Sequence, residues 1–283
     1  MQLWFQEEQD ANQRLSYKIK DVLYKGQSPF QSVHVVTSEA YGNMLLIDGL
    51  VMITDLDEFV YHEMIAHVPA LHHKAPENVV VIGGGDGGTV RELLKHPEIK
   101  KITLCEIDEL VVNTSKEFFP KVACGLDDPR VDVKIADGIA YMKSLEEGSV
   151  DIVIVDSTDP IGPGEGLFTG EFYRSVSKAL RDDGLMVCQS ESPWYDEQIL
   201  RKIQKNVSSG FDHVYPYIGA VPTYPRGFWS WTLATKKPGF DPACYDETRF
   251  KKIESNGLSY LTQPLMSAVF ALPAFYKKTL GID

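Results

Sequence analysis

Alternating hydrophobic and polar residues predict strands over most of the first 57 positions. The stretch Ser16–Tyr24 alternates, and a short apolar run follows at 32–36. Met44–Ile53 predicts two strands joined by a tight turn at Asp48-Gly49, because an Asp-Gly pair between apolar runs is a hairpin signal. The pattern then changes to that of a helix over Glu58–His73. We therefore expect a small N-terminal β domain at residues 1–57.

From residue 78 apolar strands alternate with amphipathic helices. The expected strands are 79–82, 101–105, 131–135, 152–155 and 185–189, and the expected helices are 88–96, 108–119, 139–146, 170–181 and 196–209. This alternation predicts an α/β domain at 58–283, with a parallel sheet and helices on both faces. Two late strands, 213–218 and 228–235, have no helix between them and are expected to pair antiparallel. Residues 246–283 are expected to be helical and irregular.

Composition narrows the classes of function. The formal net charge of −12 argues against a nucleic-acid partner and suits a cationic small molecule. The acidic N-terminus does not resemble a signal peptide, and no apolar stretch is long enough for a membrane span. The four cysteines lie far apart, as expected for reduced thiols in a cytoplasmic protein.

A glycine-rich segment follows the first strand of the α/β domain. Gly83, Gly85 and Gly88 fit the pattern G-x-G-x-x-G, in which glycines allow a sharp turn and close approach to a ligand. Glu106 ends the next strand, 23 residues after Gly83, where an acid could hold two ribose hydroxyls. This combination predicts an adenosine-containing ligand, either a dinucleotide or an adenosyl-sulfonium.

Two acids bear on that choice. Asp86 lies inside the glycine loop, where its charge disfavours a pyrophosphate or the carboxylate of S-adenosylmethionine. It favours a donor that keeps an amine and has lost the carboxylate. Asp137-Gly138 ends the third strand of the domain, where Asp137 could bind an adenine amine, cap the following helix, or do both.

A pair of acids, Asp156 and Asp159, follows the apolar strand 152–155. Acids at this edge of a parallel sheet suit a cationic ligand, a metal or a proton-transfer role. A metal ranks low because no other ligand cluster accompanies the pair, and His62-Glu63 followed by His67 is one residue too long for H-E-x-x-H. The glycine- and proline-rich loop 157–169 is expected to act as a mobile lid.

The motifs together resemble the polyamine aminopropyltransferase family, which includes the spermidine synthases. The resemblance covers nearly the whole chain, and the matching stretches are 41–49, 57–64, 83–88 with Arg91-Glu92, 106–108, 128–131, 137–138, 156–163, 167–168, 222–225 and 270–273. The resemblance implies a small N-terminal β domain joined to a Rossmann-like domain of methyltransferase type. It also implies transfer of an aminopropyl group from decarboxylated S-adenosylmethionine to putrescine, giving spermidine and methylthioadenosine.

The resemblance assigns roles to individual residues. Asp156 would accept the proton of the attacking amine. The donor and methylthioadenosine would be bound by Gln31, Gly83, Gly85, Asp86, Glu106, Asp137, Gly138 and Pro163. The amine substrate would be bound by Tyr61, His62, Asp86, Asp156, Asp159 and Tyr224. No metal or cofactor would be needed, because a sulfonium is already a good leaving group, and the protein would form a homodimer or homotetramer.

Two residues depart from the expected pattern. His62 stands where some relatives carry Gln, and Arg226 is a basic residue where a small one is expected. Near a diamine, Arg226 would repel the substrate unless an acid such as Glu191 or Glu165 neutralised it.

Alternatives stay open at this stage. The acceptor could be agmatine, cadaverine or spermidine. The protein could instead be an S-adenosylmethionine-dependent diamine N-methyltransferase, or a catalytically silent binding protein on the same fold.

Overall fold

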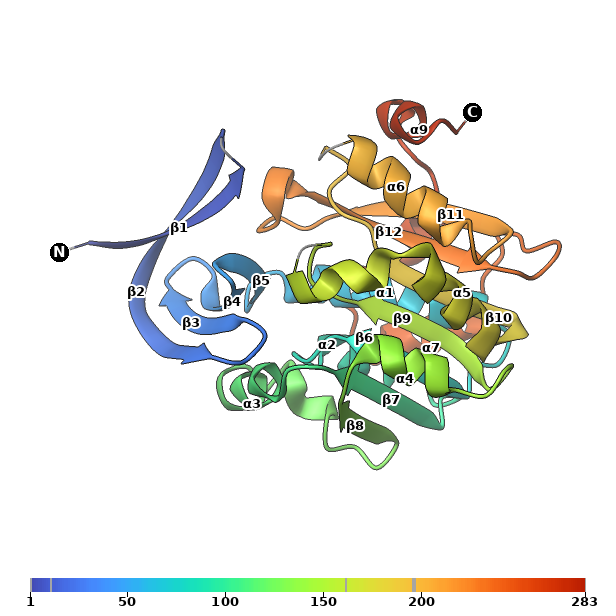
Figure 1. Ribbon diagram of the computed structural model, residues 1–283, viewed down its shortest axis with the longest axis horizontal. Helices are drawn as coiled ribbons and strands as arrows, with labels where there is room; N and C mark the ends of the chain where they lie inside the picture. Colours follow the sequence, from blue (N-terminus) through green and yellow to red (C-terminus); the bar gives the residue numbers. More distant parts are fainter. Residues whose placement is uncertain (1, 11, 161, 195–196, 283) are drawn as a thin grey trace.

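The computed structural model describes residues 2–10, 12–160, 162–194 and 197–282. Two β-sheets organise this part of the chain (Figure 1). The first is a five-stranded sheet with the order β1-β2-β3-β4-β5, in which every neighbouring pair is antiparallel. Its strands are β1 (Leu3–Asp10), β2 (Gln13–Gln27), β3 (Ser32–Ser38), β4 (Gly42–Ile47) and β5 (Leu50–Thr54). Asp48 and Gly49, both at positive φ, form the tight turn that the sequence predicts between β4 and β5.

The second sheet has seven strands in the order β11-β12-β10-β9-β6-β7-β8. They are β6 (Asn78–Gly83), β7 (Lys101–Glu106), β8 (Val131–Ile135), β9 (Val150–Asp156), β10 (Leu180–Gln189), β11 (His213–Ala220) and β12 (Phe228–Thr235). The strands from β10 to β8 are parallel, whereas β12 runs antiparallel to both β10 and β11. The sheet thus confirms the predicted α/β class and the antiparallel late pair.

Helices cover both faces of this second sheet. The helices are α1 (Glu58–His72), α2 (Gly88–Leu93), α3 (Glu109–Phe118), α4 (Gly138–Ser144), α5 (Gly170–Ala179), α6 (Glu197–Val207), α7 (Glu247–Ser255), α8 (Gln263–Ser267) and α9 (Ala274–Leu280). One core joins the sheet to α1, α2 and α7, and a second joins its opposite face to α4, α5 and α6. The two groups lie on opposite sides of the strands in Figure 1.

The central strand β9 shows why both faces are covered. Every residue of β9 is buried. Ile152 and Ile154 belong to the core with α1, and Val153 and Val155 belong to the core with α5, because successive side chains of a strand point to opposite faces. A strand whose apolar side chains point to both faces must therefore lie in the middle of the sheet.

Helix α3 connects the two sheets. Val111 of α3 and Phe119, the residue that follows this helix, pack against Val33 and Val35 of β3. This contact holds the N-terminal sheet beside the carboxyl ends of the second sheet, where the candidate site lies.

The segment after β9 is partly helical. Gly162–Phe168 forms a 3₁₀ helix within the loop predicted as a lid. Thr169 then caps α5 by accepting a hydrogen bond from Phe172 N. Among the described residues, none of the helices has the length and apolar character that spanning a membrane requires.

Candidate active site

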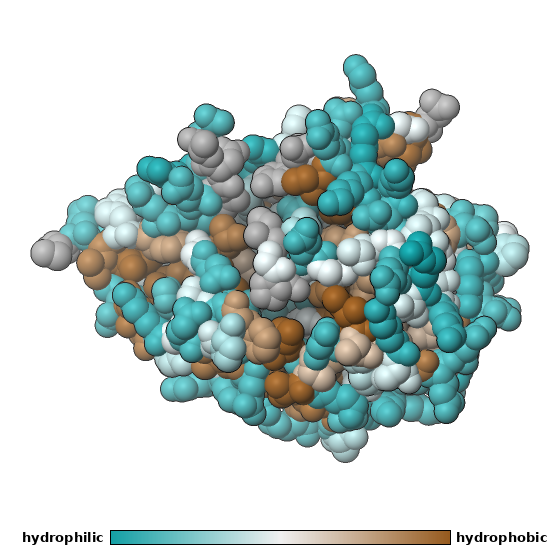
Figure 2. Space-filling view, viewed as in Figure 1, coloured by the Kyte–Doolittle hydropathy of each residue, from teal (hydrophilic) through white to brown (hydrophobic). Residues whose placement is uncertain are grey.

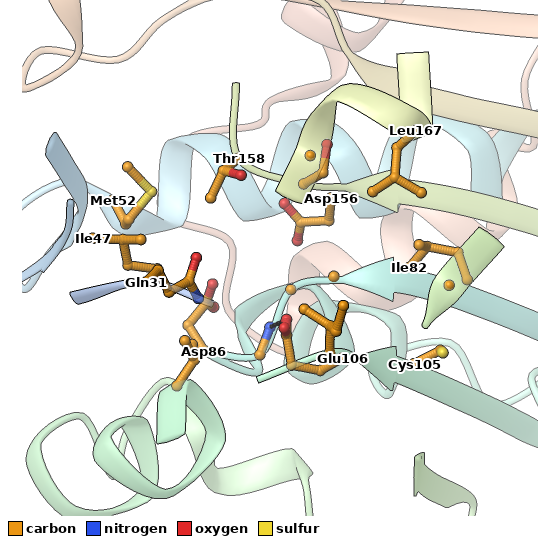
Figure 3. Close-up of a pocket in the computed structure, with 18 of the residues that line it drawn as sticks. Gln31, Ile47, Met52, Ile82, Asp86, Cys105, Glu106, Asp156, Thr158 and Leu167 are labelled. Atoms are coloured by element: carbon orange, nitrogen blue, oxygen red, sulfur yellow. Dashed lines mark hydrogen bonds between the residues drawn. The ribbon is translucent and has the colours of Figure 1, made fainter. Parts of the chain in front are cut away.

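The predicted site residues come together at one edge of the second sheet. A cavity opens at the carboxyl ends of β6, β7 and β9, and the N-terminal sheet closes its other side (Figure 3). It is lined by Gln31, Tyr61, His62, Gly83, Gly85, Asp86, Glu106, Asp137, Gly138, Asp156 and Tyr224. Asp159 lines an adjoining cavity. The side chain of Pro163 lies outside the described residues.

Asp156 is the last residue of β9 and is buried between two hydroxyl donors. Tyr61 Oη donates to Asp156 Oδ1 at 2.8 Å, and Thr89 Oγ1 donates to Oδ2 at 2.6 Å. Burial, followed by the negative charge of Asp86, raises the pKa of Asp156 above its ordinary value. A carboxylate with a raised pKa and fixed orientation is suited to accepting a proton.

The pKa of Asp86 is shifted in the opposite direction. Its Oδ1 accepts a hydrogen bond from Gly88 N at 2.7 Å and lies 3.1 Å from His62 Nε2. Although burial disfavours its charged form, His62 lowers the pKa of Asp86. The cavity therefore contains two acids whose pKa values are pushed apart, which is the usual mark of distinct chemical roles.

Glu106 ends β7 on the opposite side of the glycine loop. Its carboxylate accepts hydrogen bonds from Asp108 N at 2.9 Å and Gly85 N at 3.2 Å. Burial raises the pKa of Glu106 to about 7. Gln31, from the N-terminal segment, reaches the same place and donates from Nε2 to Asp108 Oδ2 at 3.0 Å.

Asp137 and Gly138 close the far end of the cavity. Asp137 caps α4, since its Oδ1 accepts from Ile139 N at 2.8 Å. This confirms the predicted cap and leaves the second oxygen for another donor. Gly138 lies against Ile82, and a methyl group on its Cα would approach Ile82 Cγ2 to 2.4 Å.

The glycines of the loop make room for acids as well as for a ligand. A Cβ on Gly83 would lie 2.2 Å from the carbonyl oxygen of Asp156, and one on Gly85 would lie 2.9 Å from Glu106 Cγ. Gly83 also adopts a φ of +79°, which other residues rarely adopt. The motif thus packs three neighbouring strand ends closely enough to bring their carboxylates around one cavity.

The adjoining cavity contains a second pair of acids. Asp159 and Glu191 both line it, together with Tyr224 and Trp229. Burial, followed by the charge of Asp159, raises the pKa of Glu191 well above its ordinary value, and burial raises the pKa of Asp159. Each carboxyl therefore makes the charged form of the other less favourable, and together they favour a cation or a proton between them.

The sequence alone suggests Glu191 only as a possible partner of Arg226. Glu191 follows the end of β10, the strand beside β9, so it meets Asp159 across the edge of the sheet. An acid after an apolar strand was the available signal, but the sequence does not reveal that β10 neighbours β9.

Arg226 does not pair with Glu191 or Glu165 in the structure. Its guanidinium donates to the carbonyl oxygen of Trp194 and, from Nε at 3.1 Å, to Gln13 Oε1. Its backbone has a φ of +65°, which explains why a small residue is expected at this position.

The N-terminal sheet holds one wall of the second cavity. Tyr224 Oη donates to the Met52 carbonyl at 2.7 Å. The preceding residue, Thr223, donates from its backbone nitrogen to Asp57 Oδ2 at 2.8 Å, and its carbonyl accepts from Tyr17 Oη at 3.1 Å. Residues of both sheets therefore build the site.

Two family models match this chain. A model described as the spermine/spermidine synthase domain matches residues 58–244. A second, described as the spermidine synthase tetramerisation domain, matches residues 3–55.

Curated relatives and solved structures agree with these models. The polyamine aminopropyltransferase of Bacillus mycoides is 46% identical over 275 residues, covering 97% of this chain and 98% of the relative. That of Bacillus subtilis is 44% identical, covering 97% of both chains. A spermidine synthase crystallised with the transition-state analogue AdoDATO has a TM-score of 0.94 at 40% identity, covering 99% of this chain and 95% of its own.

The spermidine synthase of Thermotoga maritima has a TM-score of 0.91 at 38% identity, again covering 99% of this chain and 95% of its own. These likenesses extend over both sheets and over the cavity between them. The chain therefore belongs to the spermine/spermidine synthase family of polyamine aminopropyltransferases.

Proposed function

We propose that the protein transfers the aminopropyl group of decarboxylated S-adenosylmethionine to putrescine, with Asp156 as the proton acceptor. The observation that carries this proposal is the meeting of two acid-lined cavities at the carboxyl edge of the sheet. The first contains Asp86, Glu106 and Asp156, and the second contains Asp159 and Glu191. A nucleoside donor and a diamine acceptor would then meet beside Asp156.

The first cavity suits the donor. Glu106 would accept from the ribose hydroxyls, and the free oxygen of Asp137 would accept from the adenine amine. The ionised Asp86 would bind the ammonium of the aminopropyl group. A methionine carboxylate at that position would face Asp86, which argues for the decarboxylated donor over S-adenosylmethionine.

The proposed chemistry is a direct displacement. An alkyl amine is protonated at neutral pH, so the attacking nitrogen first gives one proton to Asp156. Its lone pair then forms the new C–N bond while the C–S bond breaks, and the sulfonium leaves as neutral methylthioadenosine. The new secondary amine keeps its remaining protons as an ammonium, and Asp156 later releases its proton to water. No metal or redox cofactor enters these steps.

The second cavity suits the distal end of the diamine. A distal ammonium bound there would offset the mutual repulsion of Asp159 and Glu191, whose pKa values are raised. Tyr224 and Trp229 would flank the methylene chain. In this arrangement the distance between the two ammonium groups selects the acceptor, and this favours a short diamine such as putrescine.

An acceptor panel tests the proposal. The protein is incubated with decarboxylated S-adenosylmethionine and, separately, with putrescine, cadaverine, agmatine or spermidine, and the products are weighed by mass spectrometry. We expect spermidine and methylthioadenosine, with putrescine giving the highest kcat/KM. Transfer of a methyl group from S-adenosylmethionine would instead identify an N-methyltransferase, and absence of methylthioadenosine in every reaction would reject transferase activity.

We also propose that the protein assembles as a homotetramer through its N-terminal sheet. The family model that matches residues 3–55 is described as a tetramerisation domain. Leu3, Trp4 and Leu23 of this sheet are largely exposed, and Figure 2 shows hydrophobic surface on that part of the molecule. Light scattering should give a mass close to four times that of the 31.7 kDa chain, and a monomeric mass would contradict the proposal.

A further inference from the structure

A line of charged side chains runs from Asp86 away from the cavity. His62 Nε2 lies 3.1 Å from Asp86 Oδ1, and His62 Nδ1 lies 2.6 Å from Glu58 Oε2. Both oxygens of Glu58 in turn accept from the Arg91 guanidinium, at 2.8 and 2.9 Å. The side chain of His62 is only 1% exposed, so water scarcely screens these charges.

An imidazole between two carboxylates has one favourable charge state. A neutral ring carries one N–H, so one of its nitrogens would direct a lone pair at a carboxylate. The protonated ring can instead donate from Nδ1 to Glu58 while its Nε2–H forms an ion pair with Asp86. Although burial disfavours the cation, the charges of Asp86 and Glu58 raise the pKa of His62 to about 10. These contacts favour an imidazolium at neutral pH.

We propose that His62, held by Glu58 and Arg91, is a positioning residue that keeps Asp86 ionised and thereby leaves proton acceptance to Asp156. This inference rests on the proposed function, because it explains how two neighbouring acids take different roles there. It changes the role expected for His62, since an imidazolium cannot accept a hydrogen bond from a substrate ammonium.

The contacts of the two acids explain the division of roles. When two carboxylates share a buried site, one of them must have a raised pKa. Asp86 lies against a cation, whereas the hydrogen bonds to Asp156 come from the neutral hydroxyls of Tyr61 and Thr89. The position of His62 therefore decides which acid keeps its charge.

Gly88 makes room for this ring. A methyl group on its Cα would lie 2.2 Å from His62 Cε1 and 2.3 Å from Nδ1. The last glycine of the motif is thus required by the imidazole that contacts Asp86.

The groups that act on His62 come from four elements. Glu58 and Tyr61 belong to its own helix α1, Arg91 acts from α2 through Glu58, Asp86 lies in the glycine loop, and Asp156 ends β9. The negative groups outnumber the positive one. Removing the imidazolium would therefore raise the pKa of both Asp86 and Asp156.

The pH dependence of kcat/KM for the diamine tests this role. In His62→Gln the acid limb should move to higher pH by about 1–3 units, the range for loss of a contacting opposite charge, and should steepen because two acids must now lose a proton. The matched control is His72→Gln. His72 is the last residue of α1, and its imidazole bonds to the backbone carbonyls of Val68 and Pro242. The profile of this variant should coincide with that of the wild type. An unshifted acid limb in His62→Gln would overturn the proposal.

Glu58→Gln tests whether the support behind His62 matters. We expect a smaller shift in the same direction, because His62 keeps only Asp86 as an anionic partner. The double variant with His62→Gln should match His62→Gln alone, since Glu58 acts through the ring. Shifts that add would mean that Glu58 acts by another route, and the proposed arrangement would be wrong.

Nuclear magnetic resonance of labelled histidine gives a readout that does not depend on turnover. The ring signals of His62, identified by their loss in His62→Gln, should remain those of an imidazolium at a pH of about 8, well above the ordinary histidine value. A neutral ring there would refute the charge assignment even if spermidine is made. An imidazolium in a protein that makes no aminopropyl product would instead refute the proposed function alone.

Discussion

At the scale of single residues, the cavity separates two carboxylates that look equivalent in the sequence. Asp86 and Asp156 both come after apolar strands; Asp156 is buried, and the side chain of Asp86 is 15% exposed. Their contacts differ, because Asp86 meets the ring of His62 and Asp156 meets the hydroxyls of Tyr61 and Thr89. The surroundings of each acid therefore determine its role more than its position after a strand does.

Asp156→Asn should remove the proton acceptor while preserving the shape of the side chain. We expect kcat to fall by roughly 10²–10⁴-fold, the usual contribution of a general base. Binding of methylthioadenosine, measured by calorimetry, should change little. A variant that turns over near the wild-type rate would show that another group accepts the proton.

Glu106 should make nucleoside binding depend on pH. An ionised carboxylate is the better acceptor for the ribose hydroxyls, and burial raises the pKa of Glu106 to about 7. The affinity for methylthioadenosine should therefore weaken as the pH falls below about 7, by at most roughly tenfold per pH unit because one proton is involved. Titration calorimetry across this range checks the slope. Glu106→Gln should bind more weakly and lose the dependence, and an unchanged slope in that variant would assign the proton to another group.

At the scale of elements, the glycine loop and the strand ends depend on one another. β6 and β9 are paired so that Gly83 lies opposite Asp156, and Gly84 N donates to the Asp156 carbonyl at 2.8 Å. The loop therefore fixes the backbone of Asp156 directly. The glycine motif predicted a sharp turn after β6. The contact with Asp156, however, depends on the pairing of β6 with β9, two strands that are far apart in the sequence.

Gly83→Ala tests the contact between these elements. The new methyl group would meet the Asp156 carbonyl oxygen at 2.2 Å, at a backbone φ of +79°. Gly148→Ala is the matched control, because its φ is +65° with no atom within 4 Å of the added carbon. In both variants the left-handed backbone should lower the free energy of unfolding by about 1–2 kcal/mol, because alanine disfavours that conformation. Gly83→Ala should lower it further, because its methyl group also meets the carbonyl oxygen. Equal losses in urea unfolding would mean that the loop adjusts at no cost.

At the scale of the whole molecule, the second cavity, proposed to bind the amine, exists only because two sheets meet. Asp57, between the sheets, accepts from the backbone nitrogen and the hydroxyl of Thr223 and from Thr54 Oγ1. These bonds fix the segment that carries Tyr224. The first cavity, proposed to bind the nucleoside, is built largely at the edge of the second sheet.

Asp57→Asn should therefore affect the diamine more than the donor. Three donors point at the Asp57 carboxylate, so an amide would direct an N–H at one of them and loosen the Tyr224 wall. We expect KM for putrescine to rise by about tenfold, the cost of roughly one lost hydrogen bond, with little change in methylthioadenosine affinity. Asp55→Asn, which loses an exposed bond to Asn43 N, is the control. Equal effects on both ligands would show that Asp57 stabilises the whole site.

The sequence by itself determined the alternating strands and helices, the Asp48-Gly49 turn, and the acids and glycines at the strand ends. These features depend on residues close in the chain, whose periodicity and turn preferences are local. Together with the family motifs they predicted the fold class and the acidic residues that line the first cavity.

Only the tertiary structure decided which groups face these acids. Strand order placed β10 beside β9 and so brought Glu191 to Asp159, and α1 brought Tyr61 to Asp156 and His62 to Asp86. Such contacts join residues tens of positions apart, and they form where the chain buries its apolar faces. The sequence pattern predicts which faces of helices and strands are apolar, but it does not predict which of these faces pack together. The pKa shifts of the acids in this cavity depend on that packing.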